Sequence, residues 1–142
     1  MLIALCVLAM SLTWGVNLLM VHENPDSNSE GLVAETSANE IDSWLADAEA
    51  SMMLAGHTHV PLVRYVRQGV AFNVGSTTVP FAEANVIPPV GLPFSDYVIL
   101  EVEAGEVVIQ QIRLPLDVDA LGKAVAQTDM PHRDIYMSVY TR

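Results

Sequence analysis

Cysteine and basic residues are both scarce in this sequence of 142 residues. The single cysteine, Cys6, permits no internal disulfide and no cysteine-rich zinc site. Six lysines and arginines stand against seventeen acidic residues, which gives a formal net charge of −11. Binding in a nucleic-acid groove needs clustered basic side chains that face the phosphates, so we do not expect it here. A small phosphorylated substrate is compatible with this charge, because bound divalent cations reverse the local field.

The first 21 residues carry no charge, and no lysine or arginine occurs before Arg64. Such a length of apolar sequence is typical of a membrane span or a signal peptide, but the positive flank that orients these segments is absent. We therefore favour a buried strand preceded by core residues, in a cytoplasmic protein that makes no membrane contact. The alternative is that residues 1–21 anchor the chain in a membrane or direct its export.

Apolar residues make up 51% of the chain and supply enough material for a core. The continuous apolar run from Val16 to Val21 predicts a fully buried strand, and residues 51–55 predict another. Between them, Ser37-Ala38-Asn39-Glu40 matches a capping box at the start of a helix. The apolar residues that follow at helical spacing form one face of that helix: Ile41, Trp44, Leu45 and Ala48.

The second half of the chain favours strands and loops. Residues 75–93 are rich in glycine and proline and predict a long ordered loop. Asp117 can cap a short helix, and residues 131–142 are predicted to form a loose terminal tail. No domain boundary is evident, so the whole chain is treated as one partial domain. Two hairpins are predicted, pairing 62–66 with 70–74 and 97–102 with 107–112.

Three of the four histidines follow predicted buried strands. His22 follows the first, and His57 and His59 follow the second in the motif Gly-His-Thr-His. Side chains two residues apart at a strand end point to the same side, so their nitrogens can reach one metal ion or two neighbouring ions. Gly56 is expected to let the backbone turn sharply before them. A hydrogen-bonded structural role is the alternative for each histidine, and His132 is predicted to be solvated.

The order of these motifs resembles the calcineurin-like metallophosphoesterases, particularly their compact bacterial and archaeal phosphodiesterase branch. In that family a buried strand ends in histidine, and a capped helix and a second buried strand follow. Gly-His-Thr-His-x-Pro comes next, matched by residues 56–61, and a hairpin then delivers Asn-x-Gly-Ser, matched by residues 73–76. The resemblance runs from about Ser11 to about Pro131. It implies an α+β fold that is part of a four-layer α/β/β/α sandwich.

The resemblance also implies roles for single residues. His22 and His57 would bind one metal ion, and His59 would bind its neighbour. Three further residues would hold the histidine loop in place without binding metal: Gly56, Asn73 and Ser76. For Asn73 and Ser76 the alternative is bonding to the local backbone at a hairpin end.

Two departures from the family pattern matter. Glu23 stands where the family usually has glycine, which adds a carboxylate beside the proposed metal. The family also begins with Asp-x-His, Gly-Asp-x-x-Asp and Gly-Asn-His, and none of these occurs here. Those motifs supply the bridging carboxylate, the remaining ligands and the histidine that assists the leaving group. We therefore expect the N-terminal half of the domain to be missing and no catalytic residue to be present in this chain.

The resemblance implies hydrolysis of a phosphomonoester or phosphodiester at a dinuclear metal site. The complete domain would bind two divalent ions such as manganese, iron or zinc, whereas this chain would bind one or none. Alone, the chain is expected to be inactive, and poorly soluble or dimeric through its exposed sheet. The alternative is a non-catalytic module, either membrane-anchored or regulatory, that binds a metal ion or a partner protein.

Overall fold

A computed structural model describes residues 8–11, 17–84 and 86–140. Most of the apolar segment 1–21, for which a membrane anchor or export signal was the alternative, lies outside the described residues. Within the described ranges, no helix combines the length and the apolar character needed to cross a membrane.

The centre of the molecule is a five-stranded sheet with strand order β1-β2-β3-β5-β4. Its inner strands β2, β3 and β5 are mutually parallel, and the two edge strands run antiparallel to their neighbours. Parallel strands covered on both faces need apolar residues at successive positions, which explains the continuous apolar runs. The strands span Leu8–Ser11 (β1), Asn17–Met20 (β2), Met52–Ala55 (β3), Leu62–Tyr65 (β4) and Val70–Asn73 (β5).

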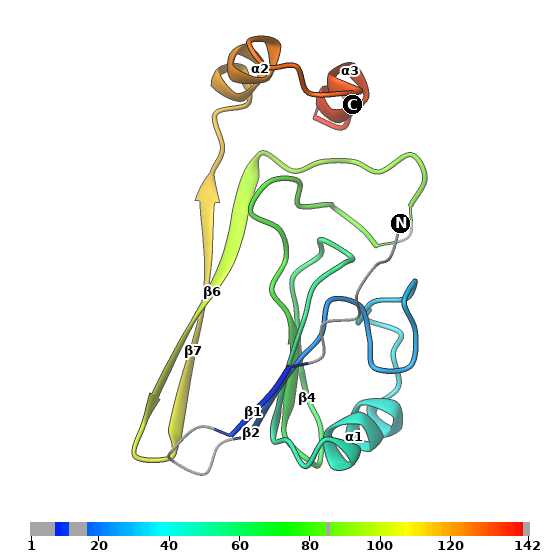
Figure 1. The fold of residues 1–142 in the computed structure, drawn as a ribbon, viewed down its shortest axis with the longest axis vertical. Coiled ribbons are helices and arrows are strands. Elements are labelled where there is room, and N and C mark those ends of the chain that lie inside the picture. Colours follow the sequence, from blue (N-terminus) through cyan, green and yellow to red (C-terminus); the bar gives the residue numbers. More distant parts are fainter. Residues whose placement is uncertain (1–7, 12–16, 85, 141–142) are drawn as a thin grey trace.

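Helix α1 (Ala38–Asp47) covers one face of this sheet (Figure 1). The predicted capping box is confirmed, because the Ser37 hydroxyl accepts from the Glu40 amide and the Glu40 carboxylate accepts from the Ser37 amide. The apolar face of the helix is also confirmed: Ile41, Trp44 and Leu45 are buried. They form one core cluster with sheet residues that include Leu19, Met53, Ala55 and Ala71.

A long hairpin of β6 (Phe94–Glu103) and β7 (Glu106–Pro115) covers the opposite face. Leu18, Met52 and Phe72 of the sheet form a second cluster there, against hairpin side chains Val98, Leu100, Val107 and Ile109. Adjacent residues of β2, β3 and β5 thus alternate between the two cores, as a period of two requires. Both hairpin strands are longer than predicted, because their pairing continues from Glu103 opposite Glu106 to Phe94 opposite Pro115.

Residues 75–93 form a long loop without helix or extended strand in its described part, as predicted. Helix α2 (Val118–Ala126) begins at its predicted cap, the side chain of Asp117. The end of the chain differs from the expected loose tail, since α3 (Arg133–Ser138) follows. The Gly91 amide donates to the Val139 carbonyl at 2.8 Å, and the Tyr140 hydroxyl donates to the Thr78 carbonyl. These bonds attach the end of α3 to the long loop.

Candidate metal site

The site lies where the parallel strands β2, β3 and β5 end, the edge at which α/β sheets usually bind ligands. His22 comes two residues after β2, and His57 comes two residues after β3. Backbone pairing continues past both strands, since the Gly56 amide donates to the His22 carbonyl at 3.0 Å. The two imidazole rings therefore lie together, with centroids 5.4 Å apart and planes nearly perpendicular.

Glu23 joins these two histidines. Its carboxylate oxygen Oε1 lies 3.8 Å from His22 Nε2 and 3.8 Å from His57 Nδ1. One nitrogen or oxygen from each residue lies within 4.8 Å of the others, so the three side chains could hold a metal ion. The Glu23 side chain is 5% exposed, whereas that of His22 is 62% exposed and gives the cluster an open side.

His59 occupies a different environment. Its Nδ1 lies 2.8 Å from the Val79 carbonyl, and its ring stacks on Phe81 with centroids 5.0 Å apart. A carbonyl only accepts hydrogen bonds, so this contact places the ring proton on Nδ1 and leaves Nε2 free as an acceptor. The structure thus brings His22 and His57 together with Glu23 and leaves His59 outside that cluster.

The backbone reversal at the histidines does not come from Gly56, so this part of the prediction is wrong. A Cβ added at Gly56 would make only ordinary contacts, the nearest with the His22 carbonyl oxygen at 3.5 Å. The turn is made by His57 and His59 themselves, whose φ angles are 66° and 59°. This left-handed region costs an ordinary side chain of the order of 1 kcal/mol, and histidine is among the residues that adopt it most often. The close approach instead occurs at Gly31, where a Cβ would lie 2.5 Å from Thr58 Cγ2.

Asn73, the last residue of β5, supports the histidine loop directly. Its side-chain amide donates to the Gly56 carbonyl at 2.5 Å and to Thr58 Oγ1 at 2.9 Å, and its carbonyl oxygen accepts from the Gly75 amide. The residue is fully buried, so these bonds satisfy polar groups that water does not reach. Thr58 was not singled out from the sequence, although its position between the two histidines was a signal for this role.

Among the hydrogen bonds of the described residues, none joins the Ser76 side chain to His22 or His57. Its hydroxyl accepts from the amides of Thr78 and Val79, at 3.3 and 3.1 Å. Those bonds shape the loop segment whose Val79 carbonyl binds His59. The Ser76 hydroxyl therefore acts within the long loop, and its link to the histidines is indirect.

An ion pair that we did not predict from the sequence links the two strands of the hairpin, at the point where the Asp96 amide donates to the Ser76 carbonyl of the loop. Arg113 of β7 binds both carboxylate oxygens of Asp96 on β6, at 2.7 and 2.9 Å. Asp96 is 1% exposed, and hydrogen bonding to its carboxylate raises the pKa of Arg113. Gly75 lies against it with φ +80°, and a Cβ there would meet Asp96 Cβ at 2.8 Å.

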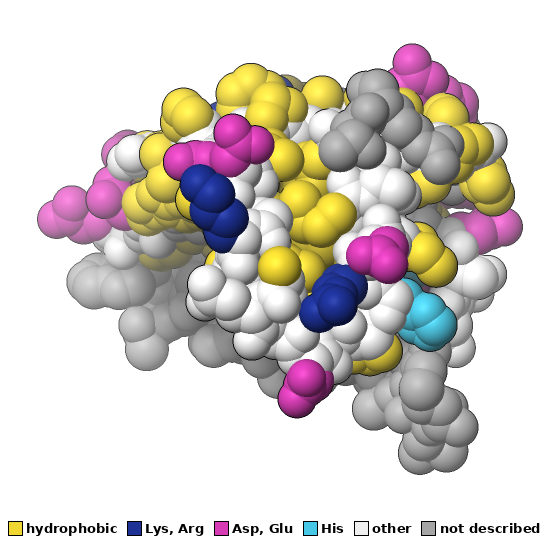
Figure 2. Space-filling model, turned by 90° about the horizontal axis from the view of Figure 1, so that it is seen from above, with side chains coloured by type: hydrophobic (Ala, Val, Ile, Leu, Met, Phe, Trp, Pro, Cys, Tyr) yellow, Lys and Arg dark blue, Asp and Glu magenta, His cyan; other side chains and the backbone are white. Residues whose placement is uncertain are grey.

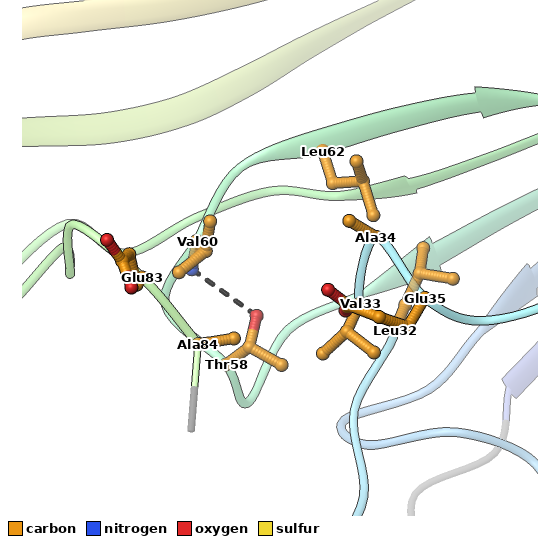
Figure 3. Close-up of a pocket in the computed structure, with 9 residues that line it drawn as sticks. All are labelled: Leu32, Val33, Ala34, Glu35, Thr58, Val60, Leu62, Glu83 and Ala84. Carbon is orange, nitrogen blue, oxygen red and sulfur yellow. Dashed lines mark hydrogen bonds between the residues drawn. The ribbon is translucent and has the colours of Figure 1, made fainter. Parts of the chain in front are cut away.

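Two hollows flank the histidine loop. One, of about 450 Å³, is lined by all three candidate histidines together with part of the long loop and of β6. The other, of about 330 Å³, contains no histidine and is lined mainly by apolar side chains, with Glu35 and Glu83 beside them (Figure 3). Thr58 borders this second hollow, where its hydroxyl accepts from the Val60 amide. The second hollow offers no metal ligand set, so we place the site in the first.

Solved structures with the same fold were found by comparison of coordinates. A hypothetical protein of Pyrococcus horikoshii OT3 superimposes with a TM-score of 0.65 at 15% identity, over 94% of this chain and 49% of that one. A metallophosphoesterase from Sphaerobacter thermophilus gives 0.61 at 16% identity, over 92% and 58%. Wild-type Vps29 from Entamoeba histolytica, complexed with Zn²⁺, gives 0.52 at 13% identity, over 77% and 59%.

No protein-family model matches the sequence, and no curated protein matches it either. The likeness is therefore one of fold. The chain spans between 49% and 59% of the length of these three structures. It has a mixed α/β structure that corresponds to about half of the metallophosphoesterase fold.

Proposed function

We propose that this chain is the histidine-bearing half of a metal-dependent phosphoesterase domain. The observation that carries the proposal is the meeting of His22, His57 and a carboxylate at the ends of parallel strands in a metallophosphoesterase fold. The complete domain would be a four-layer sandwich that hydrolyses a phosphomonoester or phosphodiester of small size. Residues beyond those of this chain would supply the remaining ligands and the group that assists departure of the leaving group.

The donor set suits the ions that such chemistry uses. Two imidazoles and one carboxylate are ligands for zinc, iron and manganese, and His22 leaves one side of the cluster accessible. When bound, divalent cations lower the pKa of a coordinated water and offset charge on the phosphoryl oxygens. His22 and His57 would hold the metal, and the second ion of a dinuclear site would take His59 through Nε2.

The other residues of the site keep these ligands in position. Asn73 fixes the loop that carries the histidines through Gly56 and Thr58. The Val79 carbonyl fixes the ring of His59, and Phe81 covers one face of it. Ligand rings whose second nitrogen is already bonded lose little freedom when metal arrives, which favours tight binding.

The test uses the full gene product that contains these residues, loaded with Mn²⁺ or Zn²⁺. Metal content and hydrolysis of p-nitrophenyl phosphate and bis(p-nitrophenyl) phosphate are measured for the wild type and for His57→Asn. Asparagine tolerates the left-handed backbone at this position, so the substitution removes the imidazole without adding strain. We expect both metal content and rate to fall about tenfold or more.

The matched control is His132→Asn, because His132 also has a left-handed φ of 58° but lies exposed at the start of α3. This variant should keep the wild-type metal content and rate. The proposal is abandoned if His57→Asn behaves like the control. Metal binding without any turnover would instead favour the alternative, a non-catalytic module that binds metal.

A further inference from the structure

The Glu23 side chain is largely buried, and no hydrogen bond among the described residues reaches its carboxylate, whose oxygens keep slight contact with solvent. Its side chain is 5% exposed, and its contacts are the two histidine nitrogens at 3.8 Å. A charged carboxylate in such a position is costly unless a cation or several donors compensate it. Direct charge-assisted bonds would bring the nitrogens to about 2.8 Å, so the two histidines do not compensate it by hydrogen bonding.

The spacing fits a shared ion better than a pair of salt bridges. Ligand atoms around a tetrahedral ion with bonds of about 2.1 Å lie about 3.4 Å apart. The observed 3.8 Å separations and the 4.8 Å limit for the whole cluster exceed this value only modestly. His22 is largely exposed and His57 is 36% exposed at its side chain, so both rings have room to turn toward a common centre.

We propose that Glu23 is itself a metal ligand, and that His22, Glu23 and His57 bind one divalent transition-metal ion without His59. The inference deepens the proposed function, on whose assignment of His22 and His57 as ligands it rests. It makes Glu23 a direct ligand beside His22 and His57, so that two ligands come from adjacent residues of one loop and the third from the next strand end. Zinc, manganese and ferrous iron are the ions that this ligand set selects.

His59 is set apart by its own contacts. Its Nδ1 is bonded to the Val79 carbonyl and its ring is stacked on Phe81, which restricts the orientation of the ring. The ligand atoms that lie within 4.8 Å of one another come from His22, Glu23 and His57. Metal bound by this chain alone should therefore depend on Glu23 and be indifferent to His59.

Calorimetric titration of the 142-residue chain with ZnCl₂ and with MnCl₂ tests this directly. The wild type should bind one equivalent. Glu23→Gln, which keeps shape and removes charge, should weaken binding about tenfold or more, since even the loss of an outer partner of a ligand costs 10–100-fold. His59→Asn, matched to the left-handed φ of 59°, should change affinity by less than about twofold.

The inference is overturned if Glu23→Gln binds metal as tightly as the wild type, or if His59→Asn loses as much affinity as Glu23→Gln. It is also overturned if the wild type binds no metal at 1 mM, a concentration of the order of the dissociation constants of the weakest specific sites. Should His57→Asn lose metal while Glu23→Gln retains it, the inference fails and the proposed function stands. Zn K-edge X-ray absorption on the wild type gives a second measurement that needs no variant to fold. It should show two imidazoles and an oxygen ligand, and three imidazoles would contradict the inference.

Discussion

The two faces of the central sheet are covered very differently. On the α1 side Ile41, Leu45 and Met53 are each 0% exposed, and the core is closed. On the other side the β6–β7 hairpin turns Val98 and Leu100 toward the sheet, but its outer face leaves Ile99 40% and Val108 52% exposed. A hairpin with apolar side chains on both faces is what a sheet shows when a further layer belongs on its outer side.

The end of the molecule that carries α2 and α3 is also rich in exposed apolar side chains (Figure 2). Seen from the end that carries α2 and α3, hydrophobic side chains spread over the surface with only scattered charged ones between them (Figure 2). The large exposed hydrophobic residues of the long loop and the C-terminal region include Ile87 at 93% and Ile135 at 67%. The α1 side is therefore a closed core, while the hairpin side and this end resemble surfaces that a complete sandwich would cover. This supports the proposal that the chain is half of a larger domain.

The largest loss of stability should come from a substitution in the closed core on the α1 side of the sheet. Met53→Ala removes a fully buried side chain of β3 that belongs to the core under α1 and should lower the free energy of unfolding by about 2–5 kcal/mol. Val108→Ala, on the outer face of the hairpin, should change it by less than about 0.5 kcal/mol. Urea denaturation of both variants measures the difference. Equal losses would show that the two faces are not as different as their exposure indicates.

The loss of the ion pair within the hairpin, between Asp96 of β6 and Arg113 of β7, should come next. Arg113→Met leaves the Asp96 carboxylate buried without its partner and should cost about 3 kcal/mol, the low end for such a change, because the Arg113 side chain is 42% exposed. Replacing both residues in the double variant Asp96→Asn, Arg113→Met should recover part of that loss. If the single variant is as stable as the wild type, the pair does not stabilise the hairpin.

The smallest effect concerns the attachment of the chain end. Burial, followed by the neighbouring Tyr136, raises the pKa of Tyr140 to about 12. A raised pKa favours the neutral phenol in the folded state, so its contribution to stability is complete below the unfolded value of about 10 and is lost as the pH rises from 10 toward 12. Absorbance at 295 nm should show one tyrosine ionising near pH 12 in the wild type but not in Tyr140→Phe. If the difference between the wild-type and Tyr140→Phe titration curves is instead centred near pH 10, the chain end is not attached.

Most of the helices and strands could be predicted from local sequence patterns. Strands that are buried on both faces are recognisable as unbroken apolar runs. The capping box of Ser37 and Glu40 indicates a helix start, because both partners lie within one turn. Helix α3 was not predicted, because six residues are too few to show a helical period. Its position depends on contacts with the long loop, about 50 or more residues earlier in the sequence.

The site was predictable in its residues and less so in its arrangement. The spacing of His57 and His59 suggested a shared side, but both adopt left-handed backbone, and His59 is held by a carbonyl 20 residues away. Glu23 was visible as a carboxylate beside His22, yet its burial depends on how the loop after β2 packs, which no local pattern encodes. Long-range contacts therefore decide which histidines meet.

Anomalous diffraction from crystals of this chain grown with Zn²⁺ tests directly whether His22, Glu23 and His57 bind metal. We expect a single strong site with these three residues as ligands, at bond lengths of about 2.0–2.2 Å. An ion bound at His59 alone, or full-strength density elsewhere with the three side chains unchanged, would contradict this expectation.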